Sequence, residues 1–369
     1  MIRVVHVLTR TNIGGPSVML VDLLDGLSTK QFEQAVVRGA SVPEEGDYLE
    51  GRTVNAEVVT IGGLRRSVGV ISELRSLFVL VRTLRRIKPD VVHTHMAKAG
   101  VIGRLAATLA GVPVRIHTFH GHLLHGYFSP AVTRLVIVVE RVLRRLTTHT
   151  LVVGAATRRD LIEARIVKSA TSTTILPPVR SLPRINPSDA RRRLGLPADG
   201  VIVGFVGRLT SIKRPDRFLA LAVGIPEATF VIFGDGPLRE TVLKDAADLP
   251  NVRVLTWNSD VALVFGALDI GVLTSDNEGI PLSLIEAATL GVPVVATDVG
   301  GVREIVDDGT TGYVVANDEE LAATTRRLVG DPQLRRSLGE RAAILVAERC
   351  SMDMYLDVHA KLYERLTST

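Results

Sequence analysis

Short aliphatic and β-branched runs alternate with helical patterns along almost the whole chain, and this rhythm limits the fold more than any other feature. In the first half, strand-like runs at 2–9, 34–37, 56–61, 90–95 and 114–117 alternate with helical patterns at 17–27, 71–87, 101–110 and 132–146. In the second half, the strand-like runs are 201–206, 229–233, 252–255, 270–273 and 294–297. Regular alternation of this kind predicts α/β architecture with doubly wound parallel sheets.

The chain divides once, at a proline-rich segment. Its 369 residues exceed what one ordinary core needs, and 176–187 holds four prolines in twelve residues. Proline cannot continue a helix interior or a central strand, so this segment is the expected hinge. We therefore predict a first domain over 1–177 and a second domain that begins at 178.

The cysteine content fits a reducing compartment. Cys350 is the only cysteine, which excludes an intrachain disulfide and a cysteine metal cluster. The N-terminus is charged within its first ten residues and is interpreted as a first strand, not a signal peptide. The apolar run 135–140 is far too short to span a membrane. A cytoplasmic protein is expected.

Charge is unevenly distributed between the two halves. Residues 1–180 hold 24 basic and 13 acidic side chains, which leaves 20 and 26 in the remainder. A basic half favours nucleic acid, an anionic bilayer or a phosphorylated substrate. Nucleic acid is disfavoured, because aromatic residues are not interleaved with the basic ones. The arginine-rich helix in 64–88 fits either a membrane surface or an ordinary solvated face.

Two loops have the composition of phosphate sites. Gly14-Gly15 precede a helix, where paired glycines permit close backbone approach and the helix N-terminus favours anions. The alternative is a tight turn. Arg208 and Lys213 follow the first strand of the second half, before a helix that begins at Pro215. Two cations at a strand end suit a diphosphate, against the alternative of solvated surface charge.

An acidic motif lies further along the chain. Glu278 and Glu286 are eight residues apart, with the first in a loop and the second two turns into the following helix. Carboxylates accept hydrogen bonds from vicinal hydroxyls, so the pair suits a sugar and a ribose. The backbone N–H groups of Gly279 and Ile280 can also donate to a sugar or phosphate. Glu286 lies among apolar residues, which favours a functional carboxylate over a solvated one.

Six of the nine histidines fall between His93 and His125. Their spacing matches no standard zinc signature, so a metal site is the less favoured interpretation. Imidazoles that contact sugar hydroxyls or move protons fit better. His93, His117 or both are expected to be hydrogen-bonded residues of the core or of a loop. Gly234 lies in a turn that allows close backbone approach, and Trp257 is interpreted as a core residue.

The motifs together resemble the retaining, nucleotide-sugar-dependent glycosyltransferases of family four. In chain order they are Gly14-Gly15, HTFHGH at 117–122, GRL-x3-KRPD at 207–216, GDGPL at 234–238, EGIPLSLIE at 278–286, VGGVREIV at 299–306 and DGTTGYVV at 308–315. The resemblance covers nearly the whole chain. It implies a GT-B fold, with two Rossmann-like doubly wound domains facing a central cleft, an acceptor-side domain over 1–177, a donor domain over 178–351, and a C-terminal helix at 352–369 that packs back on the first domain.

The resemblance also implies roles for single residues. Arg208 and Lys213 would bind the donor diphosphate and stabilise the leaving group, and Glu286 would hold the ribose. Glu278 would bind the sugar together with Gly279, Ile280 and Leu282, and His120 would act from the acceptor side. Gly14, Gly15 and Gly234 would line the donor. Such enzymes retain anomeric configuration and need no metal or other cofactor, with a UDP-sugar preferred over a GDP-sugar.

The sequence departs from the family pattern at two places, and several alternative functions stay open. Ile280-Pro281 follows Gly279 without the longer glycine-containing run of many relatives, and Pro178-Val179 replaces the usual asparagine-glycine at the hinge. A non-catalytic sugar-nucleotide-binding subunit and a nucleotide-sugar epimerase are the alternatives on the same fold. A nicotinamide oxidoreductase is disfavoured, because G-x-G-x-x-G is absent after the first strand. The acceptor is either lipid-linked, a polysaccharide precursor, or a small soluble molecule.

Overall fold

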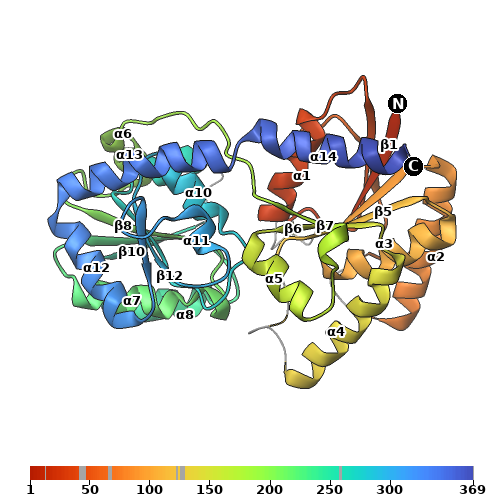
Figure 1. Cartoon of the computed structure of the whole chain (residues 1–369). Coiled ribbons are helices and arrows are strands. Elements are labelled where there is room, and N and C mark those ends of the chain that lie inside the picture. The colour runs from red at the N-terminus through yellow and green to blue at the C-terminus, as the bar shows by residue number, and fades with distance from the viewer. Residues whose placement is uncertain are drawn as a thin grey trace. The chain divides into compact units, whose positions relative to one another are not determined.

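A computed structural model describes residues 1–12, 14–40, 47–64, 69–121, 124, 129–256 and 260–368. The chain forms two compact units, and each is described by itself (Figure 1). The first unit comprises Met1–Pro178 and Met352–Thr369, and the second comprises Val179–Ser351. The first unit thus extends a single residue beyond the boundary expected at 177, and the division lies within the proline-rich segment.

The first unit is built on a seven-stranded sheet in the order β3-β2-β1-β4-β5-β6-β7. Its strands are β1 (Ile2–Leu8), β2 (Phe32–Arg38), β3 (Glu57–Thr60), β4 (Val91–His95), β5 (Val114–Phe119), β6 (His149–Val153) and β7 (Ser172–Ile175). All pairings are parallel. Parallel strands buried on both faces explain the near-continuous aliphatic runs of the sequence.

Helices cover both faces of this sheet. They are α1 (Gly15–Gly26), α2 (Val70–Ile87), α3 (Ala97–Ala110), α4 (Pro130–Leu143), α5 (Ala155–Glu163) and α14 (Met352–Thr367), with short 3-10 turns η2 (Arg144–Leu146) and η3 (Ser169–Thr171). Leu80, Leu84 and Ile102, on α2 and α3, pack with Val5 and Val7 of β1 in one core cluster. Arg104 of α3 forms a buried two-oxygen contact with Glu140 of α4 at 2.9 and 2.8 Å.

The C-terminal helix α14 belongs to the first unit although it follows the second in sequence (Figure 1). The Tyr355 hydroxyl donates to the Met19 carbonyl of α1 at 3.0 Å, and Tyr363 is fully buried. A methyl group at Gly26 of α1 would lie 2.5 Å from the end of the Leu356 side chain, so α1 packs closely against α14 at this glycine. These contacts fix α14 to the sheet face that α1 covers.

The second unit is built on a six-stranded sheet in the order β10-β9-β8-β11-β12-β13. Its strands are β8 (Ile202–Val206), β9 (Thr229–Phe233), β10 (Val252–Leu255), β11 (Ile270–Leu273), β12 (Val294–Thr297) and β13 (Gly312–Val315). Its helices are α6 (Pro187–Leu194), α7 (Pro215–Gly224), α8 (Arg239–Ala246), α9 (Val261–Gly266), α10 (Leu282–Thr289), α11 (Val302–Ile305), α12 (Asp318–Gly330) and α13 (Pro332–Arg349), with the 3-10 turn η4 (Ser211–Lys213). The doubly wound parallel sheets predicted from the sequence are confirmed in both units.

No helix in the described part of the chain has the length and apolarity needed to cross a bilayer.

Candidate donor site and histidine cluster

The loops that follow β8 and β9 are held together by backbone contacts. Leu209 N–H donates to the Asp235 carbonyl at 2.8 Å, and Leu238 N–H donates to the Leu209 carbonyl at 3.0 Å. A methyl group at Gly234 would lie 2.2 Å from the Gly207 carbonyl oxygen, so this crossing requires glycine. These backbone contacts hold the two loops together at the carboxyl edge of the sheet, where the candidate donor site lies.

Lys213 and Glu278 meet within the second unit. Lys213 lies at the end of η4, and its Nζ is 2.5 Å from Glu278 Oε1. The Ser275 hydroxyl donates to the same oxygen at 2.6 Å. Thr274 Oγ1 donates to the Lys213 carbonyl at 2.8 Å, which fixes the lysine loop against the end of β11. Sequence reasoning did not single out Ser275, although it lies in the same loop as Glu278.

This ion pair lies where the strand order of the second sheet reverses. β8 pairs with β9 on one side and with β11 on the other. Lys213 follows β8 and Glu278 follows β11, so the pair joins the two loops of the switch point. In open α/β sheets, ligands bind outside the carboxyl ends of the strands at this position.

Arg208 lies in the same loop region as Lys213. Its side chain is exposed and forms no hydrogen bond or ion pair with any described residue. Arg214, by contrast, is bound by Asp216 at 2.7 Å and Asp276 at 3.3 Å. Of these two arginines, Arg208 is therefore the one free to bind an external anion.

The segment after Glu278 turns tightly against the loop after β12. Gly301 N–H donates to the Gly279 carbonyl at 2.8 Å, and a methyl group at Gly300 would lie 1.9 Å from the Glu278 carbonyl oxygen. Helix α10 then begins after Pro281, which provides no side-chain cap. Among the described residues, no protein acceptor takes the backbone N–H of Gly279 or Ile280. Free N–H groups before a helix N-terminus favour an anion or a polyol.

Glu286 lies on the second turn of α10, between buried Ile285 and Ala287. Burial raises the pKa of its carboxyl group to about 7, although the positive charge of Arg180 opposes the rise. The sequence prediction that Glu286 is embedded among apolar side chains is confirmed. A carboxyl group that is half ionised near neutral pH is unusual, and such groups concentrate at functional sites.

The first unit holds the remaining predicted site residues. Gly14 precedes α1, which begins at Gly15 and Pro16 without a side-chain cap. The Ser17 hydroxyl in its first turn is 1% exposed and has no hydrogen-bond partner among the described residues. His120 follows β5 in the same unit. The structure thus divides the predicted residues between the units: Gly14, Gly15 and His120 lie in the first, and Arg208, Lys213, Gly234, Glu278, Gly279, Ile280, Leu282 and Glu286 lie in the second.

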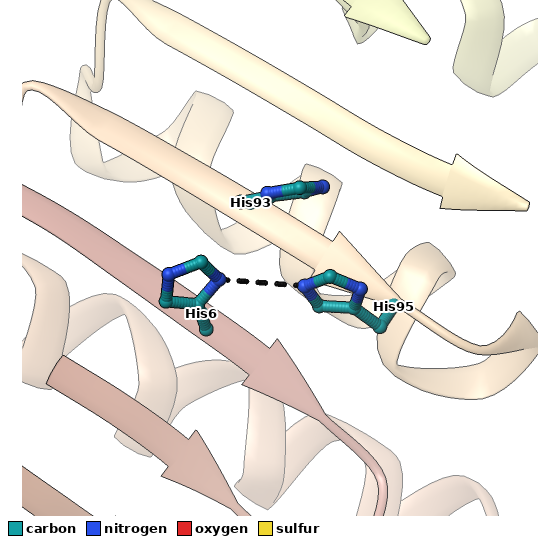
Figure 2. Close-up of side chains that lie close together, drawn as sticks. All are labelled: His6, His93 and His95. Atoms are coloured by element: carbon teal, nitrogen blue, oxygen red, sulfur yellow. Dashed lines mark hydrogen bonds between the residues drawn. The ribbon is translucent and has the colours of Figure 1, made fainter. Parts of the chain in front are cut away.

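Three histidines, His6, His93 and His95, gather on one face of the first sheet. His6 pairs in register with His93 on the neighbouring strand, and His95 is two residues further along β4 (Figure 2). Residues two apart on a strand share a face, so all three rings point to the same side. Burial lowers the pKa of His6 to about 3 and that of His120 to about 4, and it holds the pKa of His93 and His95 well below the ordinary value. These rings are therefore neutral at physiological pH.

His93 and His117 are hydrogen-bonded core residues, as predicted. His93 Nδ1 lies 2.6 Å from the Tyr363 hydroxyl, and its Nε2 lies 2.6 Å from Thr118 Oγ1. His117 Nδ1 donates to Thr94 Oγ1 at 2.9 Å, because that hydroxyl itself donates to the Ile116 carbonyl. The contact of Tyr363 on α14 with His93 was not predicted from the sequence, since the two are 270 residues apart.

A metal ion is the alternative explanation for the cluster of His6, His93 and His95. One nitrogen from each of His6, His93 and His95 lies within 4.8 Å of the others. However, both nitrogens of His93 already face hydroxyl groups, and the rings of His93 and His95 are only 33° from parallel at a centroid distance of 4.3 Å. Metal ligands instead direct their lone pairs toward one point. The geometry fits a hydrogen-bonded network better than a metal centre.

Three residues of the sequence predictions, His122, His125 and Trp257, lie outside the described part of the chain.

Comparisons with known proteins agree with this architecture. Residues 14–178 match the model of the glycosyl transferase 4-like domain, and residues 188–344 match that of glycosyl transferases group 1. The chain is 30% identical over 350 residues to a 2-deoxystreptamine N-acetyl-D-glucosaminyltransferase of Streptomyces fradiae, covering 86% of this chain and 82% of the relative. The chain belongs to glycosyltransferase family 4. It is a GT-B enzyme that transfers a sugar.

Other relatives of this glycosyltransferase carry related names. An Escherichia coli UDP-Gal:alpha-D-GlcNAc-diphosphoundecaprenol alpha-1,3-galactosyltransferase is 28% identical over 328 residues, with 85% of this chain and 84% of the relative covered. Among solved structures, Anabaena HepE in complex with UDP and glucose matches with a TM-score of 0.84 at 22% identity, covering 99% and 100% of the two chains. A likeness at that identity supports the two-domain GT-B fold.

Proposed function

We propose that this glycosyltransferase moves a hexose-type sugar from a UDP-sugar to an acceptor hydroxyl, with retention of anomeric configuration and without a bound metal. The assignment of the donor site rests on the Lys213–Glu278 pair at the switch point of the second sheet. It places a cation and a carboxylate beside unclaimed backbone N–H groups, which is what a sugar diphosphate requires. UDP is preferred because UDP or UDP-Gal is named in relatives of the same fold.

The roles that we propose for the donor-site residues are those that the family resemblance implies. Arg208 and Lys213 bind the diphosphate and stabilise the charge that develops on it as the sugar departs. The Glu278 carboxylate, oriented by Ser275, accepts from a sugar hydroxyl. Gly279, Ile280 and Leu282 lie at the uncapped start of α10 and donate to the sugar or its phosphate. Glu286 accepts from the ribose hydroxyls, and Gly234 keeps the backbone open beside them.

The first unit supplies Gly14, Gly15 and His120. The uncapped start of α1 favours the donor phosphates, and the neutral imidazole of His120 forms a hydrogen bond with a substrate hydroxyl. In the front-face mechanism that we propose, the departing diphosphate itself takes the acceptor proton, so no protein nucleophile is needed. Product NMR tests retention: an anomeric coupling opposite to that of the donor would overturn it. Full activity after EDTA treatment is expected if no metal takes part.

A thermal-shift screen tests the donor assignment. Purified protein is heated with UDP, GDP, ADP, dTDP and their common sugars, and the screen is repeated with Lys213→Ala and Glu286→Ala. A ligand that binds only the folded state raises the melting temperature. We expect uridine ligands to stabilise the wild type and to lose their effect in both variants. Lys244→Ala is the matched control, because Lys244 is exposed on α8 of the same unit. Stabilisation by GDP alone would overturn the UDP preference.

For the acceptor we propose a lipid-linked substrate at an anionic bilayer. Helix α4 exposes Leu135, Val138 and Val142 with exposed fractions of 62%, 54% and 52%. Arginines at 134, 141 and 145 lie on the same stretch of chain. Helix α2 exposes Ile71, Leu74 and Phe78 at 85%, 62% and 67%, again with arginines nearby. Apolar residues bordered by arginines favour the surface of an anionic membrane.

Vesicle sedimentation tests this acceptor class. We expect the protein to bind vesicles with anionic lipid at low salt and to release them at high salt or with zwitterionic lipid alone. Leu135→Ser with Val138→Ser should weaken binding, whereas Leu243→Ser, an exposed leucine on α8, should not. Absence of binding to anionic vesicles would favour a soluble acceptor, as in the name of the Streptomyces fradiae relative.

A further inference from the structure

Three histidines of the first unit form a continuous chain of hydrogen bonds that ends at His120. His6 Nδ1 lies 3.4 Å from His95 Nε2, as the dashed line in Figure 2 shows. His95 Nδ1 lies 3.1 Å from His120 Nε2. At the two ends, His6 Nε2 and His120 Nδ1 are buried and have no partner among the described residues.

Only two proton arrangements satisfy this chain. Each ring is neutral and carries one proton, and each nitrogen–nitrogen contact needs one proton to form a hydrogen bond. If His95 carries its proton on Nε2, then His6 and His120 must also carry theirs on Nε2. If His95 carries it on Nδ1, both neighbours must carry theirs on Nδ1. The tautomer at one end of the chain therefore determines the tautomer at the other end.

Gln34 distinguishes the two arrangements. Its Nε2 donates to the Leu24 carbonyl of α1 at 3.0 Å, and because a carbonyl can only accept, the orientation of the amide group is fixed. The remaining atom, Oε1, is a buried acceptor without a partner among the described residues. Gln34 pairs in register with Val4, two residues before His6, so its side chain and the His6 ring lie on the same sheet face as diagonal neighbours. Gln34 also opposes the lowering of the His6 pKa that burial causes.

Because Gln34 Oε1 is a buried acceptor beside His6, it favours the His6 tautomer that directs an N–H group toward it. With the proton on Nε2, His6 presents N–H to Gln34 Oε1. With the proton on Nδ1, two lone pairs face each other in a dry environment, which is unfavourable. His120 Nδ1 is unpaired in both arrangements, so the Gln34 end decides between them.

We propose that Gln34, through His6 and His95, holds His120 in the Nε2–H tautomer, so that His120 Nδ1 is a hydrogen-bond acceptor for a substrate hydroxyl. Gln34, His6 and His95 are positioning residues, and none of them needs to touch substrate. The second half of this statement rests on the role proposed above for His120. The tautomer itself does not, because it is a property of the free protein.

Nitrogen-15 NMR of the full chain with labelled histidine tests the tautomer directly, since protonated and bare ring nitrogens differ in chemical shift and coupling. The His120 signals are assigned by their loss in His120→Asn. We expect a protonated Nε2 and a bare Nδ1 for His120, and the same pattern for His6 and His95. A protonated Nδ1 on His120 in the wild type would overturn the proposal.

Gln34→Met removes the acceptor at the far end while keeping side-chain volume. We expect the Nδ1–H form of His120 to appear in this variant and the transfer rate to fall by the fraction of that form, with the donor KM less affected than kcat. His149→Gln is the control, because His149 bonds Thr173 Oγ1 and lies outside the chain of rings. It should leave the His120 signals unchanged. Gln34→Glu keeps an acceptor, so it should retain the wild-type tautomer even if Gln34→Met is too unstable to study.

The two halves of the proposal fail separately. If the NMR result holds but His120→Asn transfers sugar at the wild-type rate, the proposed role of His120 is wrong and the tautomer assignment stands. If Gln34→Met leaves the His120 tautomer unchanged, Gln34 does not set it, whatever the activity shows.

Discussion

The two units of this glycosyltransferase bury ionisable side chains of opposite kinds. All nine histidines of the chain lie in the first unit, and none lies between Val179 and Ser351. The seven that are described all have lowered pKa values. The second unit instead buries the carboxyl group of Glu286, whose pKa is raised. Burial favours the neutral form in both cases, but it does so by removing protons in one unit and retaining them in the other.

This difference gives the two units opposite responses to pH. A histidine that is neutral in the folded state and titrates near 6.5 when unfolded favours unfolding as the pH falls below 6.5. A carboxyl group with a raised pKa in the folded state favours unfolding as the pH rises. The predictions that follow test this contrast, beginning with the largest expected effect.

Mild acid should unfold the first unit before the second. Below pH 6.5, each buried neutral histidine lowers the free energy of unfolding by about 1.4 kcal/mol per pH unit until its folded pKa is reached. Because seven described histidines contribute, the loss between pH 6.5 and 5 should reach several kcal/mol. Hydrogen exchange followed by mass spectrometry, corrected for intrinsic rates, locates the loss. Earlier loss of protection in 179–351 would contradict the contrast.

Removal of the cations in the second unit should affect catalysis and leave the fold intact. Lys213→Met and Arg208→Met should each lower kcat by about 10² to 10³, because the leaving diphosphate loses a fixed positive charge. Initial transfer rates and UDP calorimetry measure the effect, with Lys244→Met as the matched control on the exposed side of α8. Both variants should melt near the wild-type temperature. Wild-type kcat in Lys213→Met would remove Lys213 from the site.

The two units also differ in how much the sequence reveals. Arg208, Lys213 and Glu278 lie in loops near glycine and proline, and Glu286 lies in an apolar helix, so all four polar residues stand out against an aliphatic background. The doubly wound fold follows from the same alternation. The direct ion pair between Lys213 and Glu278 was not predicted, because it depends on the strand order that places β8 next to β11.

The histidine network of the first unit was not predictable in the same way. His6 lies within an ordinary strand pattern, and Gln34 is one polar residue in the next strand. Their relation to His95 and His120 depends on sheet register. The strands β6, β7 and β13 were also missed. β7 has the sequence STTI, which gives little apolar signal.

The affinity for the donor should depend on the ionisation of Glu286. In the free protein its carboxyl group has a pKa of about 7, and only the ionised form accepts from two ribose hydroxyls. Affinity for UDP-glucose should therefore fall as the pH drops below 7, approaching tenfold per pH unit. UDP-glucose is the suitable probe because each of its phosphates carries one ester and one anhydride bond and therefore does not titrate in this range. Calorimetry from pH 5.5 to 8.5 measures the slope.

Glu286→Gln separates affinity from stability at this position. The variant should bind UDP-glucose more weakly at pH 8 and should show no comparable dependence on pH. The pKa of Glu286 is about 7 in the folded protein, against an ordinary value of 4.5. The free energy of unfolding of the wild type therefore falls by up to about 3 kcal/mol as the pH rises from 4.5 to 7. The variant should therefore melt above the wild type at pH 8 and close to it at pH 4.5. A wild-type pH slope in the variant would assign the titration to another group.

Tyr363→Phe should have the smallest effect of the four, and it should be confined to the first unit. The change removes the hydroxyl that lies 2.6 Å from His93 Nδ1 and leaves a buried nitrogen without a partner, which costs about 1 to 3 kcal/mol of unfolding free energy. Urea unfolding measures that loss. Tyr355→Phe is the comparison on the same helix, because its hydroxyl donates to a backbone carbonyl and touches no histidine nitrogen.

Calorimetry on Tyr363→Phe should show UDP-glucose affinity unchanged, since the lost hydroxyl contacts His93 in the first unit, whereas Lys213, Glu278 and Glu286 belong to the second unit. The steepness of acid unfolding should also change in this variant but not in Tyr355→Phe, because a freed His93 Nδ1 can accept a proton more readily. A Tyr363→Phe protein with the acid profile of Tyr355→Phe would mean that burial alone, without the hydrogen bond from α14, keeps His93 neutral.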